Sequence, residues 1–167
     1  MFIGPVYNIS NLGPSTGGSV PVTMVQYKSG TNGAGEVLRV SLTQGSNTTS
    51  TQCIAQLNRK TTGATVTAAT AGTNLFKQNS ANPTTDATLA TSGTGITATV
   101  EGTNGEQPWI RGFNSLNGVE YLSSPEERIM VAQVSNATYN IVGVTLANTA
   151  LSANWVADLK WRELRGA

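Results

Sequence analysis

The chain has 167 residues, enough for one domain with a sizeable core, and ten basic and nine acidic residues give it a net charge of +1. Charged residues make up 11 % of the sequence, against about 25 % in ordinary soluble domains. The absence of histidine and the single cysteine exclude imidazole catalysis, zinc sites with histidine ligands and an intrachain disulfide framework. No basic stripe supports nucleic-acid binding.

The first 21 residues hold a short apolar segment between Gly and Pro residues, without the basic start and apolar core of a signal peptide. We expect residues 1–21 to form an edge strand or, alternatively, an arm that reaches onto a neighbouring protein. No apolar run is long enough to span a membrane. The sequence therefore predicts synthesis in the cytoplasm and no membrane partner.

Two strands with one apolar face each are predicted in residues 36–44 and 52–60, because apolar and polar residues alternate there. Their expected core residues are Leu38, Val40, Leu42, Cys53, Ala55 and Leu57. Cys53 should then be a buried, inert thiol. The Gly-rich residues 30–35 have the spacing of a phosphate-binding loop, but a strand follows them, which indicates a hairpin loop.

Residues 61–92 are polar, and we expect long surface loops there, with weak strands near 64–70 and 85–90. A further alternating strand is predicted around residues 94–102, with Ile96, Ala98 and Val100 on its apolar face.

Asn-Gly pairs at positions 32–33, 104–105 and 117–118 predict type I′ turns, in which both central residues have positive φ. The last pair is expected to close a hairpin between residues 109–116 and 119–122. Trp109, Phe113 and Asn114 beside it are the one plausible set for a carbohydrate-binding platform, although core packing explains them more simply.

Glu126 and Glu127 are the only adjacent acids and the first candidates for paired-carboxylate chemistry. Neighbouring residues of a strand point to opposite faces, so there the pair would not act on one substrate. The sequence Ser124-Pro125-Glu126-Glu127 has instead the pattern of a capping box, which predicts one helical turn before a strand at 128–135.

The remaining charged residues form no cluster. Asp86 and Asp158 lie far apart in the sequence, Asp158 on the expected outer face of the last strand, and no acids gather into a calcium cage. The cations Arg59, Lys60, Arg162 and Arg165 could contact an anion, but a solvated face is the commoner arrangement. The sequence thus predicts no enzyme, no catalytic or metal-binding residues, no cofactor and no small-molecule substrate, and it leaves partner-binding residues unassigned.

The last two strands have different patterns. Residues 139–147 are apolar on both faces, with Tyr139 and Ile141 on one and Val142, Val144 and Leu146 on the other. Such a strand is covered on both sides, by a second layer or by a neighbouring subunit. The final strand is expected to face the core with Trp155, Ala157, Leu159 and Trp161.

Together these elements predict one all-β domain over residues 1–167, an antiparallel β-sandwich of the jelly-roll type with about 8–10 short strands and long polar loops.

The order of segments resembles the decoration, or cement, proteins of tailed bacteriophages, which bind the outside of the capsid as jelly-roll trimers. The segments that carry it run in the order VYNISNL, EVLRVSLTQ, IAQLNRKTTGATVTA, WIRGFNSLNGVEYLSSPEERIMVAQ and VADLKWREL. The resemblance implies a structural virion protein on the capsid exterior, a homotrimer bound to the major capsid protein, synthesised in the host cytoplasm. It implies no catalytic residues. The alternative is a carbohydrate- or receptor-binding jelly roll of a phage fibre or spike.

Overall fold

The fold is a sandwich of two antiparallel sheets, seen in a computed structural model that describes residues 4–15, 21–45, 50–95, 100–134, 138–147 and 153–165. Within these ranges no residue is helical, which confirms the all-β prediction. The strands are β1 (Val6–Ser15), β2 (Val22–Lys28), β3 (Gly33–Gln44), β4 (Gln52–Thr62), β5 (Thr67–Ala68), β6 (Leu75–Lys77), β7 (Gly93–Thr94), β8 (Thr103–Asn104), β9 (Trp109–Asn114), β10 (Val119–Leu122), β11 (Ile129–Val131), β12 (Ile141–Leu146) and β13 (Ala153–Arg165). They outnumber the expected strands because β5 to β8 have two or three residues each.

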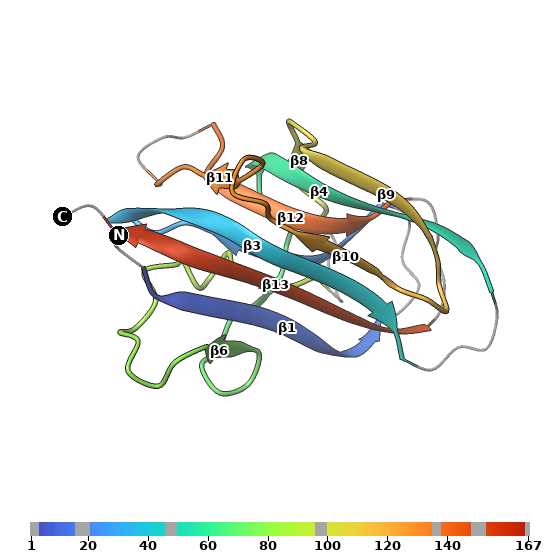
Figure 1. Cartoon of the computed structure of the whole chain (residues 1–167), viewed down its shortest axis with the longest axis horizontal. Coiled ribbons are helices and arrows are strands. Elements are labelled where there is room, and N and C mark those ends of the chain that lie inside the picture. The colour runs from blue at the N-terminus through green and yellow to red at the C-terminus, as the bar shows by residue number, and fades with distance from the viewer. Residues whose placement is uncertain are drawn as a thin grey trace.

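The connectivity is that of a jelly roll (Figure 1). Sheet A has the order β10–β3–β13–β1–β6, and β11 continues the line of β10 along β3. Sheet B contains the order β2–β12–β4, with β9 on the free side of β4. Strands that follow one another in the sequence mostly change sheet, and β1 pairs with β13 from Val6 to Ser15. The predicted fold class is therefore confirmed.

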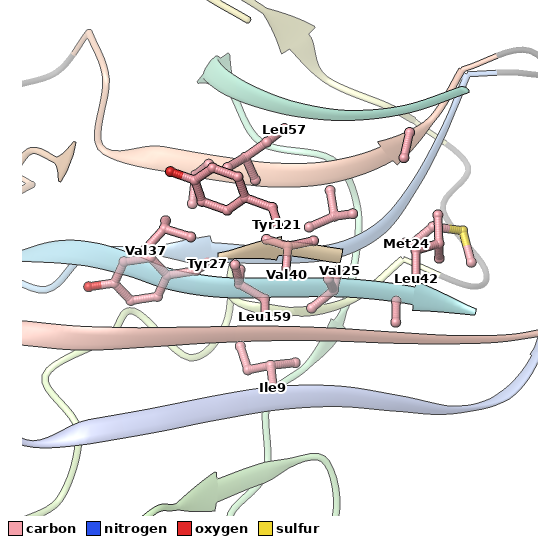
Figure 2. Packing of buried hydrophobic residues seen from close by; sticks show 14 of the residues in the cluster. Ile9, Met24, Val25, Tyr27, Val37, Val40, Leu42, Leu57, Tyr121 and Leu159 are labelled. Atoms are coloured by element: carbon pink, nitrogen blue, oxygen red, sulfur yellow. The ribbon is translucent and has the colours of Figure 1, made fainter. Parts of the chain in front are cut away.

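The core lies between the two sheets and is rich in aliphatic and aromatic side chains (Figure 2). The ring centroid of Trp161 lies 4.6 Å from Tyr27 and 5.8 Å from Tyr7 in stacked arrangements. All four residues predicted to face the core from the last strand are 0 % exposed. Burying a large apolar side chain stabilises the fold by about 1.5–3 kcal/mol, so this strand is one of its main supports.

One core position on β3 differs from the prediction. The pairing of β13 with β3 shifts between Lys160 and Trp161, which leaves Leu38 without a partner on β13. Val37 is 0 % exposed and takes the core position, whereas Leu38 is half-buried. A β-bulge of this kind reverses the alternation locally, so the expected inward placement of Leu38 is wrong.

A long connection between β4 and β9, residues 63–108, covers the outer face of sheet B, and we call it the insert. Its short strands pair with the outer strands of both sheets: β6 with β1, β7 with β2, β5 with β7 and β8 with β4. The weak strand expected near 64–70 is present as β5. The one at 85–90 is wrong, because a turn replaces it, with the Ser92 N–H bonded to the Thr88 carbonyl at 2.9 Å.

The alternating strand expected around 94–102 falls largely outside the described residues, since 96–99 are not among them. Val100 does lie within the described part, is 59 % exposed and belongs to no strand.

The strand with two apolar faces is covered within one chain. All six residues of β12 are buried. Val142, Val144 and Leu146 belong to the core, and on the opposite face the methylene groups of Lys60 lie over Gly143. The outer face of β12 is thus covered by the Lys60 side chain of the neighbouring strand β4 and by the insert. Burial of this strand therefore requires no neighbouring subunit.

The predicted hairpin at Asn117-Gly118 is wrong, because β9 pairs with β4 in sheet B and β10 pairs with β3 in sheet A. The turn crosses between the sheets: the Asn114 carbonyl accepts the N–H groups of Asn117 and Gly118. Gly118 has a φ of 69°, but no asparagine in the described residues has a positive φ. Type I′ turns are therefore absent from all three Asn-Gly pairs.

The Gly-rich residues 30–35 form another crossing between sheets, from β2 to β3, and not the hairpin loop that was expected. A Cβ on Gly30 would lie 1.7 Å from the Asp86 carbonyl oxygen, and one on Gly35 would lie 2.4 Å from the Tyr27 ring. These glycines allow the backbone to pass close to its neighbours.

Candidate interaction surface

The two sides of the sandwich differ in the strands that end the sheets there. On one side β1 and β2 continue into the short strands β6 and β7 of the insert. On the other side, β9, β10 and β11 have no further strand beside them in the described part of the chain. We call residues 109–131 the β9–β11 edge. Uncovered sheet edges are places where proteins pair with other chains.

Exposed apolar side chains gather along this edge. Of the five large apolar side chains that are exposed in the described residues, four lie here: Ile110 at 50 %, Leu116 at 52 %, Leu122 at 67 % and Met130 at 37 %. Alternation with the buried Tyr121 and Val131 turns Leu122 and Met130 to the outer face of sheet A. Leu122 and Met130 thus form an exposed apolar pair on the outer face of sheet A, whereas alternation with the buried Phe113 turns Ile110 to the outer face of sheet B. Exposed apolar side chains of this kind are common at contact sites.

Aromatic contacts hold the edge in place. The Trp109 ring lies 5.7 Å from Tyr121, and Phe113 meets Trp155 edge-on at 6.1 Å. Asn114 fixes the following turn, since its Oδ1 accepts the Leu116 N–H at 3.0 Å. The three residues considered for a carbohydrate platform therefore pack inward or hold a turn, as the simpler explanation predicted.

Ion pairs flank the edge on the outer face of sheet A. Arg39 Nε lies 2.5 Å from Glu120 Oε1 across the β3–β10 pair. Glu36, whose side chain is 2 % exposed, lies 3.2 Å from Arg128 and 3.4 Å from Arg162. A buried carboxylate with two guanidinium partners joins β3, β13 and the start of β11.

A shallow polar hollow of about 240 Å³ lies beside these pairs. Its lining includes Arg39, Ser41, Thr43, Asn117 and Glu120. Hydroxyl, amide and charged groups therefore meet on the outer face of sheet A near the crossing turn.

The acidic pair lies in a β-turn and not in a helical turn. The Glu127 N–H donates to the backbone carbonyl of Ser124 at 3.2 Å, and both acids are exposed. The Glu127 carbonyl accepts the Tyr121 hydroxyl at 2.9 Å. The predicted helical turn with a capping box is therefore wrong. The stretch is nevertheless a structural turn, as the sequence indicated. Within the described residues, no three potential metal ligands come together.

Of the four cations named from the sequence, three have defined environments, and the side chain of Arg165 lies outside the described residues. Arg59 pairs with Glu106 at 2.5 Å, and Arg162 pairs with Glu36. Lys60 is 1 % exposed, so the expectation of a solvated face is wrong for it. Alternation places Lys60 on the polar face of β4, and only the fold of the insert covers it.

Beneath the insert, polar groups are held by hydrogen bonds. Lys60 Nζ donates to the Glu101 carbonyl at 2.6 Å. Gln26, 0 % exposed, accepts the Ala64 N–H at 2.9 Å and donates to the Thr91 carbonyl at 2.6 Å. Burial lowers the pKa of Lys60, and the nearby Glu101 opposes that shift.

Two buried tyrosines have a raised pKa. Burial raises the pKa of Tyr27, with smaller contributions from Glu163 and Asp86. Burial also raises the pKa of Tyr121. The thiol of Cys53 is buried, as predicted. Asp158 lies on the outer face of β13, where it accepts the Ser10 hydroxyl at 2.6 Å.

No family model, no curated protein and no solved structure matches this chain. Among the described residues, no helix is long and apolar enough to cross a membrane.

Proposed function

We propose that this chain is a structural virion protein that binds the outer surface of a phage capsid as a homotrimer and stabilises the shell. Two things support the proposal: the jelly-roll architecture, and the resemblance of the segment order to phage decoration proteins. The partner is the major capsid protein, and the reinforcement needs no catalysis.

The observation that carries the proposal is the β9–β11 edge. Its exposed apolar side chains project from strands that are anchored by ring contacts such as Trp109–Tyr121. Rigid strands lose little conformational entropy on binding, which favours a docking surface formed in advance. On the opposite side the sheets end in the short strands β5 and β6 of the insert, which offer less edge for pairing than β9.

Reinforcement follows from mass action. A protein that binds the assembled lattice and not the dispersed subunits shifts the equilibrium toward the intact shell. Of the cations at the edge, Arg39 and Arg128 already have carboxylate partners, and Arg111 is the one left for a charge contact among the described residues, so binding depends mainly on packing and hydrogen bonds. Moderate salt therefore weakens it little.

The test is to mix the purified protein with undecorated heads assembled from the major capsid protein that is encoded with it, and to sediment them across a salt series. We expect co-sedimentation up to moderate salt, followed by a higher rupture temperature of the decorated heads. Failure to co-sediment, or binding without any gain in heat resistance, contradicts the proposal.

A second candidate function, binding of a carbohydrate or receptor by a fibre or spike module, is favoured by the polar hollow at Asn117. Its hydroxyl and amide lining offers hydrogen bonds to sugar hydroxyls, but Trp109 and Phe113 are turned toward other rings and supply no stacking platform. Specific signals on a glycan array, with no binding to heads, would favour this candidate.

A further inference from the structure

On the side away from β4, the backbone of β9 has hydrogen-bonding groups that pair with no other strand in the described residues. The Ser115 N–H donates to the Thr51 carbonyl at 2.9 Å, which makes residues 51 and 115 a hydrogen-bonded pair. In an antiparallel ladder such pairs recur at every second residue. By the register, the next ones are Cys53 with Phe113, Ala55 with Arg111 and Leu57 with Trp109. The N–H and C=O groups of Ile110 and Gly112 therefore point away from β4, toward the open side.

Within the described residues, the surroundings of Gly112 do not require a glycine. Its φ is not in the positive range, and an added Cβ would meet nothing closer than the Cys53 carbonyl oxygen at 4.0 Å. On β12, by contrast, a Cβ on Gly143 would lie 2.7 Å from Lys60 Cε. A glycine inside a strand costs about 0.5–1 kcal/mol relative to alanine. Because β9 has no side chain at Gly112, an added strand could place a large side chain opposite this position.

The positive charge of Arg111, next to Gly112, indicates which side chains an added strand should carry. Arg111 is exposed and has no ion-pair partner among the described residues. In a strand added to β9, Ile110 and Gly112 would form hydrogen-bonded pairs, and Arg111 would form the non-hydrogen-bonded pair, where side chains lie closest. An acidic residue opposite Arg111 and an apolar residue opposite Ile110 would then stabilise the pairing.

We propose that β9 receives an extended segment of the capsid partner as an added antiparallel strand, which pairs with the main-chain groups of Ile110 and Gly112 and places an acidic residue opposite Arg111. This rests on the proposed function and names the contact through which it acts. A second copy of the chain fits less well: symmetric pairing about Gly112 would place Phe113 of the other copy opposite Arg111 and leave the guanidinium without a counter-charge. Strand addition to a free edge is a known mode of recognition, in which main-chain bonds give affinity and side-chain pairs give specificity.

Two variants test the contact. Ile110→Pro removes an N–H group that points away from β4 in the described residues, and Arg111→Glu reverses the charge. Ala68→Val is the control, because it changes an exposed residue on β5, at the opposite end of sheet B. We expect Arg111→Glu and Ala68→Val to keep the unfolding temperature of the parent protein.

Affinity for undecorated heads is measured by co-sedimentation at constant salt. Ile110→Pro should bind about two- to tenfold more weakly, because it loses one main-chain hydrogen bond. Arg111→Glu should also bind more weakly, because it places like charges opposite each other. Ala68→Val should bind like the parent. In hydrogen exchange, the amides of Ile110 and Gly112 should exchange quickly in the free protein and become protected on the heads.

The outcomes separate the two proposals. If the parent protein does not bind heads, the proposed function fails. If the parent binds and folded Ile110→Pro and Arg111→Glu bind equally well, the strand addition is wrong and the function stands. If these variants instead lower the oligomeric mass of the free protein, β9 pairs copies of this chain and the capsid segment is the wrong occupant.

Discussion

At the scale of single residues, Lys60 is the side chain whose environment differs most from what its type suggests. It is 1 % exposed, its methylene groups cover Gly143, and its ammonium donates to the Glu101 carbonyl. Burial of a charged group without a carboxylate bonded to it destabilises the charged form, so the pKa is lowered. Lysine is used here both as a spacer and as a hydrogen-bond donor.

This placement predicts a pH effect on stability. Because the folded pKa of Lys60 lies below its usual 10.5, the unfolded chain binds more protons in that window, and the free energy of unfolding rises with pH up to about 10.5. Lys60→Met lacks this contribution. Denaturant unfolding from pH 8 to 11 should therefore show the parent gaining stability relative to Lys60→Met, while the tyrosine contributions, shared by both proteins, cancel. A constant difference across the range would contradict the buried, titrating lysine.

The turn before β11 gives a second residue-scale prediction. Ser124 contributes its backbone carbonyl to the turn, and Glu126 is exposed. Ser124→Ala and Glu126→Gln should each change the free energy of unfolding by no more than about 0.5 kcal/mol. Thermal or chemical unfolding measures this, and a loss of about 1 kcal/mol or more for Ser124→Ala would restore the hydroxyl cap.

Sequence alternation identified most buried residues correctly, including Cys53, Ala55 and Leu57, since the pattern of a half-buried strand is local. It missed Lys60 and Leu38 for different reasons. Lys60 is covered by a segment that is distant in sequence. Leu38 is displaced from its core position by a β-bulge, which the local alternation of residues does not predict. The open edge at Ile110 was missed because strand patterns do not reveal which strand ends a sheet.

At the scale of elements, the insert is what distinguishes this jelly roll. Through Gln26 and Lys60 its backbone is bonded to the outer face of sheet B, and its short strands extend β1 and β2. The Asn-Gly pair at 117–118 shows the limit of turn prediction. The residues suit a tight turn, but whether the next strand stays in the same sheet depends on pairing with β3, far away in the sequence.

The contact between β4 and β12 can be tested by a double-mutant cycle. A Cβ on Gly143 would lie 2.7 Å from Lys60 Cε, so Gly143→Ala should destabilise the fold by about 1–3 kcal/mol through overpacking. In a Lys60→Ala background the same substitution should cost much less. Equal costs in both backgrounds, measured by urea unfolding, would show that the two residues do not share this space.

At the scale of the whole molecule, the proposed trimer requires a surface between copies, and the outer face of sheet A at Leu122 and Met130 offers the apolar part of one. Light scattering at micromolar concentration should give a mass three times that of one chain. Leu122, 67 % exposed, can be changed to Arg without disturbing the core, and Leu122→Arg should lower the mass while Ala68→Val should not. A monomer mass for the parent protein would contradict trimerisation.

The position of β13 has a consequence for biosynthesis. It lies between β1 and β3 and pairs with both along most of its length, yet it is the last described strand to leave the ribosome. Without residues 153–165, sheet A lacks its central strand, and β1 and β3 are not joined. Topologies dominated by distant pairings fold in milliseconds to seconds. Closure of sheet A therefore depends on the described strand that is synthesised last, and a variant truncated before β13 should aggregate or be bound by chaperones.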